Sequence, residues 1–163
     1  MNELPHLDDH GRSRMIDIGG KAITRRTAIA TGRLDTTPAV LELLAANQLR
    51  KADALPTARV AGIQGAKRTS ELVPLAHTLP LESVTVDFEL STSSVEIRAT
   101  VAATAKTGAE MEALTAVAIA GLALHDMIKS VEDSNAVSAV VLRVDSPGGT
   151  TSGSEALHTA LRQ

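Results

Sequence analysis

The stretch of sequence that decides the fold is VTVDFELSTSSVEIRATV, residues 84–101. Apolar and polar residues alternate along 84–90 and again along 95–101, and the polar segment STSS lies between the two runs. Successive side chains of a strand point to opposite faces of its sheet, so this period of two predicts an antiparallel hairpin with one buried and one solvent-exposed face.

Helical patterns lie on both sides of this hairpin. Residues 108–131 form the longest helix candidate, and Thr107 and Glu110 fit a capping box at its start. Residues 56–72 predict another helix, one face of which is made almost entirely of Ala and Gly. Because a glycine inside a helix costs roughly 1 kcal/mol relative to alanine, that face indicates a place where another backbone approaches closely.

Shorter apolar runs at 15–18, 28–34 and 137–144 predict further strands. Thr37 suits the N-cap of an additional helix, since a proline follows it in the first turn. Helices interleaved with an antiparallel hairpin predict an α+β sandwich, in which helices cover one face of a mostly antiparallel sheet.

Length and composition exclude several functional classes. The 163 residues suit one domain, expected over 1–144, followed by a Gly-, Ser- and Thr-rich loop and tail over 145–163. The absence of cysteine excludes disulfides and thiolate metal sites, and Phe88 as sole aromatic residue excludes an aromatic platform for nucleobases. The net charge of −3 argues against a general nucleic-acid binder, and no apolar run reaches about 18 residues without a polar interruption. We expect a soluble, cytoplasmic protein without a signal peptide.

The lack of aromatic residues also bears on assembly. The core must be filled with Ala, Val, Leu and Ile, which bury less area each, at about 25 cal/mol per Å². A lone protomer would therefore have a thin core, and association would bury more area. We expect an oligomer.

His77 is a candidate general base because prolines at positions 74 and 80 bracket its loop. A stiff backbone can hold an imidazole in the hydrogen-bond geometry that proton transfer requires. An ordinary histidine in a surface loop fits the local sequence as well or better.

Charged residues interrupt the apolar pattern of the long helix. Asp126 and Lys129 share a helix face, either as an ordinary ion pair or as functional groups in a buried setting. Glu112 precedes Asp126 by 14 residues, so the two carboxylates lie within about 40° on one face but about 21 Å apart along the axis. If both ends of the helix are catalytic, the simplest solution is a site shared between subunits. A solvated carboxylate is the other interpretation of Glu112.

Basic residues gather in the first half of this acidic chain. They are Arg25, Arg26, Lys51, Arg59, Lys67 and Arg68. Such a cluster suits a polyphosphate or carboxylate ligand. For any one of these basic residues, a place on a solvated charged surface is the more common explanation.

Several sequence blocks agree with one known family. The most specific are ARVAGIQGAKRT at 58–69 and KTGAEMEALT at 106–115. The shorter blocks are MID at 15–17, KAD at 51–53, PLAH at 74–77 and DMIK at 126–129. Together they closely resemble the cyclic pyranopterin monophosphate synthase family, also called the molybdenum cofactor biosynthesis protein C family. The resemblance runs nearly collinearly from about residue 4 to about residue 144.

The resemblance implies a fold, an assembly and a reaction. It implies a ferredoxin-like α+β fold in a hexamer, a trimer of dimers, with active sites at subunit interfaces. The implied substrate is (8S)-3′,8-cyclo-7,8-dihydroguanosine 5′-triphosphate, which a radical S-adenosylmethionine enzyme makes from GTP. The implied products are cyclic pyranopterin monophosphate and pyrophosphate. These steps are acid–base and phosphate chemistry, so we expect no cofactor, no redox metal and no metal-ligating residue in the site.

Matching positions carry the family's site residues onto this chain. The implied acid–base residues are Lys51, Asp126 and Lys129. The implied substrate-binding residues are Leu75, Ala76, His77, Met111 and Glu112, with Lys67 and Arg26 as candidates for holding the triphosphate. Because the neighbouring Asp126 favours the charged form of Lys129, we expect Lys51 to be the general base and Lys129 an acid or charge stabiliser.

The chain departs from the family pattern in two places. The family motif Pro-Leu-Cys-His-Pro reads Pro74-Leu-Ala-His77-Thr78 here. The family's lysine-containing C-terminal loop is replaced by DSPGGTTSG at 145–153, with no lysine after Lys129. This second change leaves an alternative function open, that of a degenerate paralogue which binds the nucleotide or assembles with partners without efficient turnover.

Overall fold

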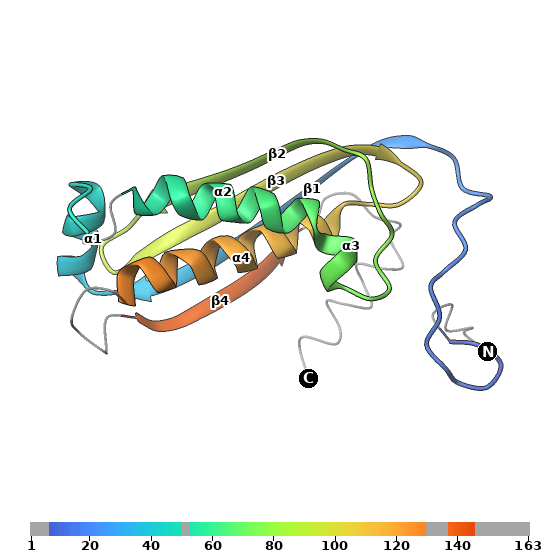
Figure 1. Ribbon diagram of the computed structural model, residues 1–163, viewed down its shortest axis with the longest axis horizontal. Helices are drawn as coiled ribbons and strands as arrows, with labels where there is room; N and C mark the ends of the chain where they lie inside the picture. The colour runs from blue at the N-terminus through green and yellow to red at the C-terminus, as the bar shows by residue number, and fades with distance from the viewer. Residues whose placement is uncertain (1–6, 50–52, 130–136, 146–163) are drawn as a thin grey trace.

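An antiparallel sheet forms the scaffold of the molecule. The computed structural model describes residues 7–49, 53–129 and 137–145, the last of these as backbone only. In this part of the chain, the strands are β1 (Thr24–Thr36), β2 (Leu81–Leu90), β3 (Ser94–Ala105) and β4 (Val137–Asp145). They pair in the order β2-β3-β1-β4, and each pair of neighbours runs antiparallel (Figure 1).

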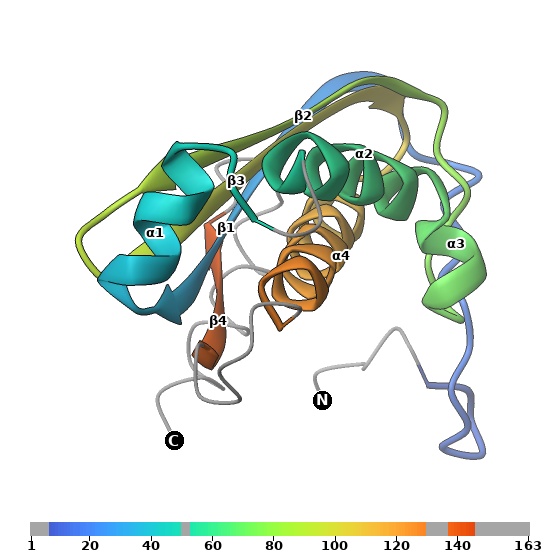
Figure 2. The same ribbon diagram turned by 60° about the vertical axis from the view of Figure 1, so that its left-hand side comes forward.

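Helices cover one face of this sheet (Figures 1 and 2). They are α1 (Pro38–Ala45), α2 (Ala54–Lys67), α3 (Thr69–Leu72) and α4 (Glu110–Lys129). The chain order places helices between β1 and β2 and α4 between β3 and β4, while β1 and β3 are the central strands. This arrangement is ferredoxin-like. The predicted α+β sandwich with helices on one face is confirmed.

β2 and β3 form the hairpin that the alternating sequence predicts. Val86 and Ile97 are each 1% exposed and belong to the core beneath the helices, whereas Asp87 on the other face is exposed. The turn is closed by the amide of Ser91, which donates to the carbonyl of Ser94 at 2.8 Å. The hairpin prediction is therefore confirmed in its position and in the face that it buries.

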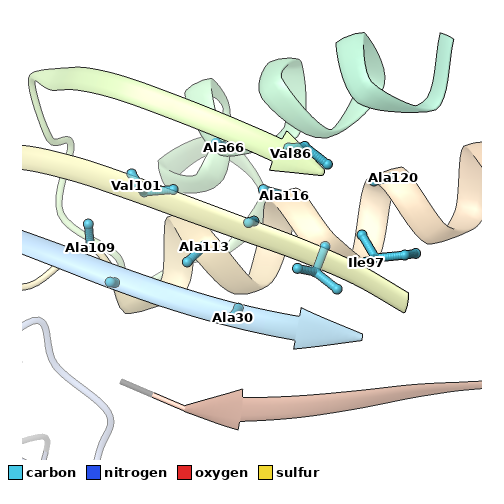
Figure 3. Close-up of a cluster of buried hydrophobic side chains, with 12 residues drawn as sticks. Ala30, Ala66, Val86, Ile97, Val101, Ala109, Ala113, Ala116 and Ala120 are labelled. Carbon is cyan, nitrogen blue, oxygen red and sulfur yellow. The ribbon is translucent and has the colours of Figure 1, made fainter. Parts of the chain in front are cut away.

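The core consists mainly of small side chains, as the composition predicts. One buried cluster joins β1, β2 and β3 to α2 and α4, and alanines make up most of it (Figure 3). The labelled alanines of this cluster are Ala30, Ala66, Ala109, Ala113, Ala116 and Ala120. A second cluster, rich in leucine, fills the end of the molecule near α1.

Two glycines bring α2 and α4 into close contact. A Cβ atom on Gly62 would lie 2.8 Å from the carbonyl oxygen of Ala116, and one on Gly65 would lie 2.8 Å from the side chain of Ile119. Real Cβ atoms do not approach so closely, so the two helices could not pack at this distance with alanine at either position. The close backbone approach predicted from the Ala- and Gly-rich face is confirmed.

The expected strand at 15–18 is wrong. These residues have no regular secondary structure, and the first strand of the sheet begins at Thr24. The run is short, and its carbonyl at Ile16 contacts a side chain of the domain instead of a neighbouring strand. The run at 28–34 does form a strand, which extends beyond it at both ends because β1 pairs with β3 and β4.

The helix expected over 56–72 is divided into two. α2 begins two residues earlier, at Ala54, and ends at Lys67, while α3 is a separate short helix. The break follows from Thr69, a buried residue whose hydroxyl donates to the carbonyl of Ala66 at 2.9 Å. This bond satisfies a carbonyl group at the end of α2.

The helix caps agree with the sequence in one case only. The amide of Val40 donates to the Thr37 hydroxyl at 3.4 Å, so Thr37 is the N-cap of α1 as predicted. The predicted capping box of α4 is wrong. Its first helical bond runs from the amide of Ala113 to the carbonyl of Ala109, so Ala109 holds the N-cap position and Thr107 lies outside the helix.

α4 is long and apolar enough to cross a membrane by length and composition alone. More than half of it is buried inside the molecule, between the sheet and α2. It is therefore the core helix of a globular domain. The strand predicted over 137–144 is present as β4, and residues 146–163 lie outside the described part of the chain.

Candidate active site

The candidate residues gather at the two ends of α4. At the helix start lie Met111 and Glu112, together with the loop between α3 and β2 that carries Leu75, Ala76 and His77. The start of β1 and the end of α2 lie at this end too, shown on the right in Figure 1. Arg26 and Lys67 belong to these two segments.

The other end of α4 carries Asp126 and Lys129, both of which are exposed. Of the two interpretations, the buried setting is wrong: they lie on the accessible side of the helix, because the buried positions here are Leu124, Met127 and Ile128. At 1.5 Å per residue, Asp126 is about 21 Å along the axis from Glu112. One protomer therefore does not bring these two carboxylates together.

Lys51 lies outside the described residues, so its contacts are not assigned. The described residues on either side of it belong to the same end of the molecule as Asp126. Leu49 and Ala54 pack in one buried cluster with Leu124 and Ile128 of α4.

Glu112 is the most buried of the described candidate residues, with 4% of its surface exposed. It follows the Ala109 cap by three positions, in the first turn of α4. Burial raises the pKa of the Glu112 carboxyl above its ordinary 4.5, the negative charge of Glu110 adds to the rise, and a hydrogen bond from its own backbone amide opposes it. The carboxyl is thus held in a setting that favours its neutral form.

His77 is half-buried, and its Nε2 lies 3.0 Å from the carbonyl oxygen of Ile16. Two apolar candidates at the same end of α4 are accessible, because Leu75 is 40% exposed and Met111 is 41% exposed. This end of the molecule therefore carries accessible apolar side chains, an imidazole and a buried carboxyl.

Arg26 contributes a positive charge to the same end. Its Nε atom is buried, and among the described residues it has no hydrogen-bond partner. A buried guanidinium nitrogen without a partner is costly unless a ligand supplies an acceptor. Lys67 is exposed at the last turn of α2. Both cations are available to an anionic ligand.

A small cavity of about 130 Å³ lies apart from these groups. It is bounded by the end of α1 and the start of α2 and is lined by Leu44, Asn47, Leu49, Ala54, Leu55 and Pro56. None of the described candidate residues lines it. Across the described residues, no group of three or more His, Asp or Glu side chains is arranged to hold a metal ion.

Comparison with known proteins decides the family. The sequence model of the MoaC family matches residues 15–149, which is most of the chain. The chain belongs to the MoaC family. The resemblance seen in the sequence blocks is thereby confirmed.

Curated relatives cover most of this MoaC-family chain. It is 47% identical over 152 residues to "Cyclic pyranopterin monophosphate synthase" of Streptomyces avermitilis, covering 93% of this chain and 88% of the relative. It is 55% identical over 130 residues to "Cyclic pyranopterin monophosphate synthase 2" of Mycobacterium tuberculosis strain H37Rv, covering 80% and 78%. The corresponding protein of Chloroflexus aggregans is 48% identical over 144 residues, covering 87% of each chain. These relatives bear the enzyme name that the sequence blocks had predicted.

The structure shows a contact of the MoaC-family chain that the sequence did not predict, although MID at 15–17 is one of the matching blocks. Residues 16–19 of the N-terminal arm contact the His77 end of the molecule, and Lys106 donates from its Nζ to the carbonyl of Gly19 at 2.6 Å. Lys106 is the first residue of the KTGAEMEALT block at 106–115, and its place in that block was the signal that could have identified it as a functional residue. Its partner is 87 positions away and is a backbone atom, so no sequence pattern identified the contact.

Proposed function

We propose that this chain is a cyclic pyranopterin monophosphate synthase of molybdenum cofactor biosynthesis. It converts (8S)-3′,8-cyclo-7,8-dihydroguanosine 5′-triphosphate into cyclic pyranopterin monophosphate and releases pyrophosphate. The observation that carries the proposal is the shared enzyme name of relatives 47–55% identical over most of the chain. The charged groups at the two ends of α4 are of the types that this reaction needs.

The phosphate step needs a base and cations. A hydroxyl oxygen of the substrate attacks the α-phosphorus, its proton passes to a base, the bond to the bridging oxygen breaks, and pyrophosphate leaves with the charge. Arg26 and Lys67 are suited to hold that charge, because guanidinium and ammonium groups make strong charge-assisted bonds to phosphate. The buried Nε of Arg26, which has no hydrogen-bond partner within the described part of the chain, supports this role.

The acid–base groups of the proposal are Lys51, Asp126 and Lys129. Lys51 acts as general base, and Lys129 beside Asp126 acts as an acid or stabilises developing charge. Because Asp126 and Lys129 are exposed and remote from His77 in one protomer, the proposal requires a neighbouring protomer to complete each site. A homo-oligomer, proposed as a hexamer built from three dimers, supplies this neighbour.

Two further features support association. The core of one protomer is built mainly from alanine, which buries little area per residue. Large apolar side chains remain accessible on the outer surface of the helices, including Val60, Leu72 and Leu122, which are 56–65% exposed. We place the enzyme in the cytoplasm with a small-molecule substrate, and with neither nucleic acid nor membrane as a partner.

A turnover assay tests the function. The purified protein is incubated with the cyclised GTP intermediate, and pyrophosphate release and pterin formation are followed together. Wild type should release one pyrophosphate per pterin formed, and Lys129→Ala should lower the rate by about 10²–10⁴-fold through loss of acid–base catalysis. The control is Arg12→Ala, which removes an exposed cation paired with Asp8.

The same assay separates the alternative function. A degenerate paralogue would bind the intermediate without converting it. That alternative depends on the lysine-free segment 145–153, whose side chains are not among those that the structure describes. Bound but unconverted intermediate at full occupancy would therefore reject the synthase in favour of the binding protein.

A further inference from the structure

Two side chains from different loops hold one short segment of the N-terminal arm. His77 Nε2 lies 3.0 Å from the carbonyl oxygen of Ile16, and Lys106 Nζ lies 2.6 Å from that of Gly19. Within the segment, the Gly19 amide donates to the Asp17 carboxylate at 2.7 Å and the Lys21 amide donates to the Ile18 carbonyl at 3.0 Å. Residues 16–21, which contain a turn at 18–21, are therefore fixed to the domain at Ile16 and at Gly19. We call residues 16–21 the arm clasp.

The partner of His77 determines which ring nitrogen carries the proton. A backbone carbonyl oxygen can only accept a hydrogen bond, so Nε2 of His77 must be the donor. A neutral imidazole has a single N–H group. In this neutral form, Nδ1 is the nitrogen that keeps a lone pair, and among the described residues no side chain or backbone group of the chain bonds to it.

Lys106 connects this contact to the rest of the site. It lies between the end of β3 and the start of α4, four to six residues before Glu110, Met111 and Glu112. Its ammonium group is charged and its bond to Gly19 is short, features of a strong hydrogen bond. Within the described part of the chain, residues 15–18 belong to no strand, so the bonds from His77 and Lys106 help to hold this part of the arm against the domain.

We propose that Lys106 is a positioning residue: it secures the arm clasp, whose Ile16 carbonyl fixes His77 so that Nδ1 is presented to the substrate. The inference rests on the proposed function for the identity of that substrate, but the contact itself does not depend on turnover. The clasp acts on His77 through backbone atoms. Lys106 consequently influences the reaction without touching the substrate.

NMR of the full-length protein tests the positioning directly. In wild type, the Nε2–H proton of His77 should give an exchange-protected signal, assigned by its absence in His77→Gln, and Nδ1 should have the nitrogen shift of an unprotonated ring atom. Lys106→Met should abolish the protected signal, and Lys106→Arg, which keeps a cationic donor, should restore it. Arg12→Met, which removes a different arm cation bonded to Asp8, is the matched control and should leave the signal unchanged.

Steady-state kinetics with the cyclised GTP intermediate give the second readout. Loss of one charge-assisted hydrogen bond corresponds to about a tenfold fall in kcat/KM, expected here mainly as a rise in KM because His77 is placed in substrate binding. Lys106→Arg should recover most of the loss. A thermal unfolding midpoint close to that of wild type confirms that each variant is folded.

Hydrogen exchange of the Lys21 amide reports on the clasp itself. The side-chain amide nitrogen of Gln lies near the position of the His Nε2 atom, so His77→Gln should keep the Lys21 backbone amide protected from exchange but should lower substrate affinity. Asn is too short to reach the Ile16 carbonyl, so His77→Asn should lose both the protection of the Lys21 amide and the substrate affinity. If the His77 signal and the Lys21 protection survive in Lys106→Met, the inference is wrong. If wild type shows these signals but no turnover, the proposed function fails and the positioning contact stands.

Discussion

Glu112 illustrates how one buried charge shapes the site. In the described chain its carboxyl is almost fully buried, and burial raises its pKa above the ordinary value. A carboxyl whose pKa is higher in the folded state than in the unfolded state lowers the stability of the fold at every pH above the unfolded-state pKa, where the unfolded chain carries the ionised form. Natural proteins retain such groups where function requires them, which agrees with the proposed substrate contact.

Glu112→Gln should stabilise the protein at pH 7. Below the ordinary pKa of 4.5, Glu112 is protonated in both the folded and unfolded states and carries no penalty. As the pH rises through that value and on through the raised pKa of the folded state, the unfolded state ionises first and stability is lost. The variant escapes this loss. Urea unfolding at equal protomer concentration should show an advantage at pH 7 that shrinks towards pH 4; an advantage that stays constant or grows on acidification would contradict the assignment.

A second residue-level feature lies at the junction of α1 and α2. Asn47 and Asp53 both have left-handed backbone conformations, with φ of 53° and 58°. Their side chains join them, because Asn47 Nδ2 donates to Asp53 Oδ1 and the Asp53 amide donates to Asn47 Oδ1, each at 3.0 Å. The pair closes the chain segment that contains Lys51.

Substitutions at Asn47 separate its two contributions. Asn47→Gly removes the hydrogen bonds but accepts the left-handed conformation, and should cost about 1 kcal/mol in unfolding free energy. Asn47→Ala adds the steric cost of a Cβ in that conformation, so its loss should be about 2 kcal/mol. Chemical unfolding measures both. A glycine variant less stable than the alanine variant would show that backbone conformation is not what selects Asn47.

At the level of elements, the contact between α2 and α4 sets the position of the site. α4 carries candidate residues at both ends, and the two glycines of α2 let it lie close to that helix. Glycine lowers the helix propensity of α2, so the close packing must offset this cost. The Ala- and Gly-rich face of α2 therefore fixes the placement of the candidate groups on α4.

Gly62→Ala should destabilise the domain by about 1–3 kcal/mol, although alanine is the better helix former. Its Cβ would lie 2.8 Å from the Ala116 carbonyl oxygen and 3.0 Å from the Ala120 Cβ, so backbone must move. Gln64→Ala, at an exposed position on the same helix, is the control and should change the unfolding free energy by less than about 0.5 kcal/mol. Equal effects of the two variants would contradict the close-packing account.

For the whole molecule, local patterns predicted the fold well and the site incompletely. The alternation around Val86 and Ile97 is a property of neighbouring residues, so it identified the hairpin and its buried face. The clasp could not be found in this way, because its bonds join residues 61 and 87 positions apart and use backbone oxygens. The sequence also left the exposure of Asp126 undecided, since a helix that is apolar on most sides does not reveal which side its neighbours leave open.

We propose that each site combines the His77 end of one protomer with the Lys129 end of another. His77→Ala and Lys129→Ala, each with a different affinity tag, are co-expressed, and mixed oligomers are purified through both tags. Each variant alone should be inactive. In a random equal mixture about one quarter of shared sites receive both intact ends, so the mixed oligomers should show about one quarter of wild-type turnover per protomer. Mixed oligomers no more active than the single variants would contradict a site shared between subunits.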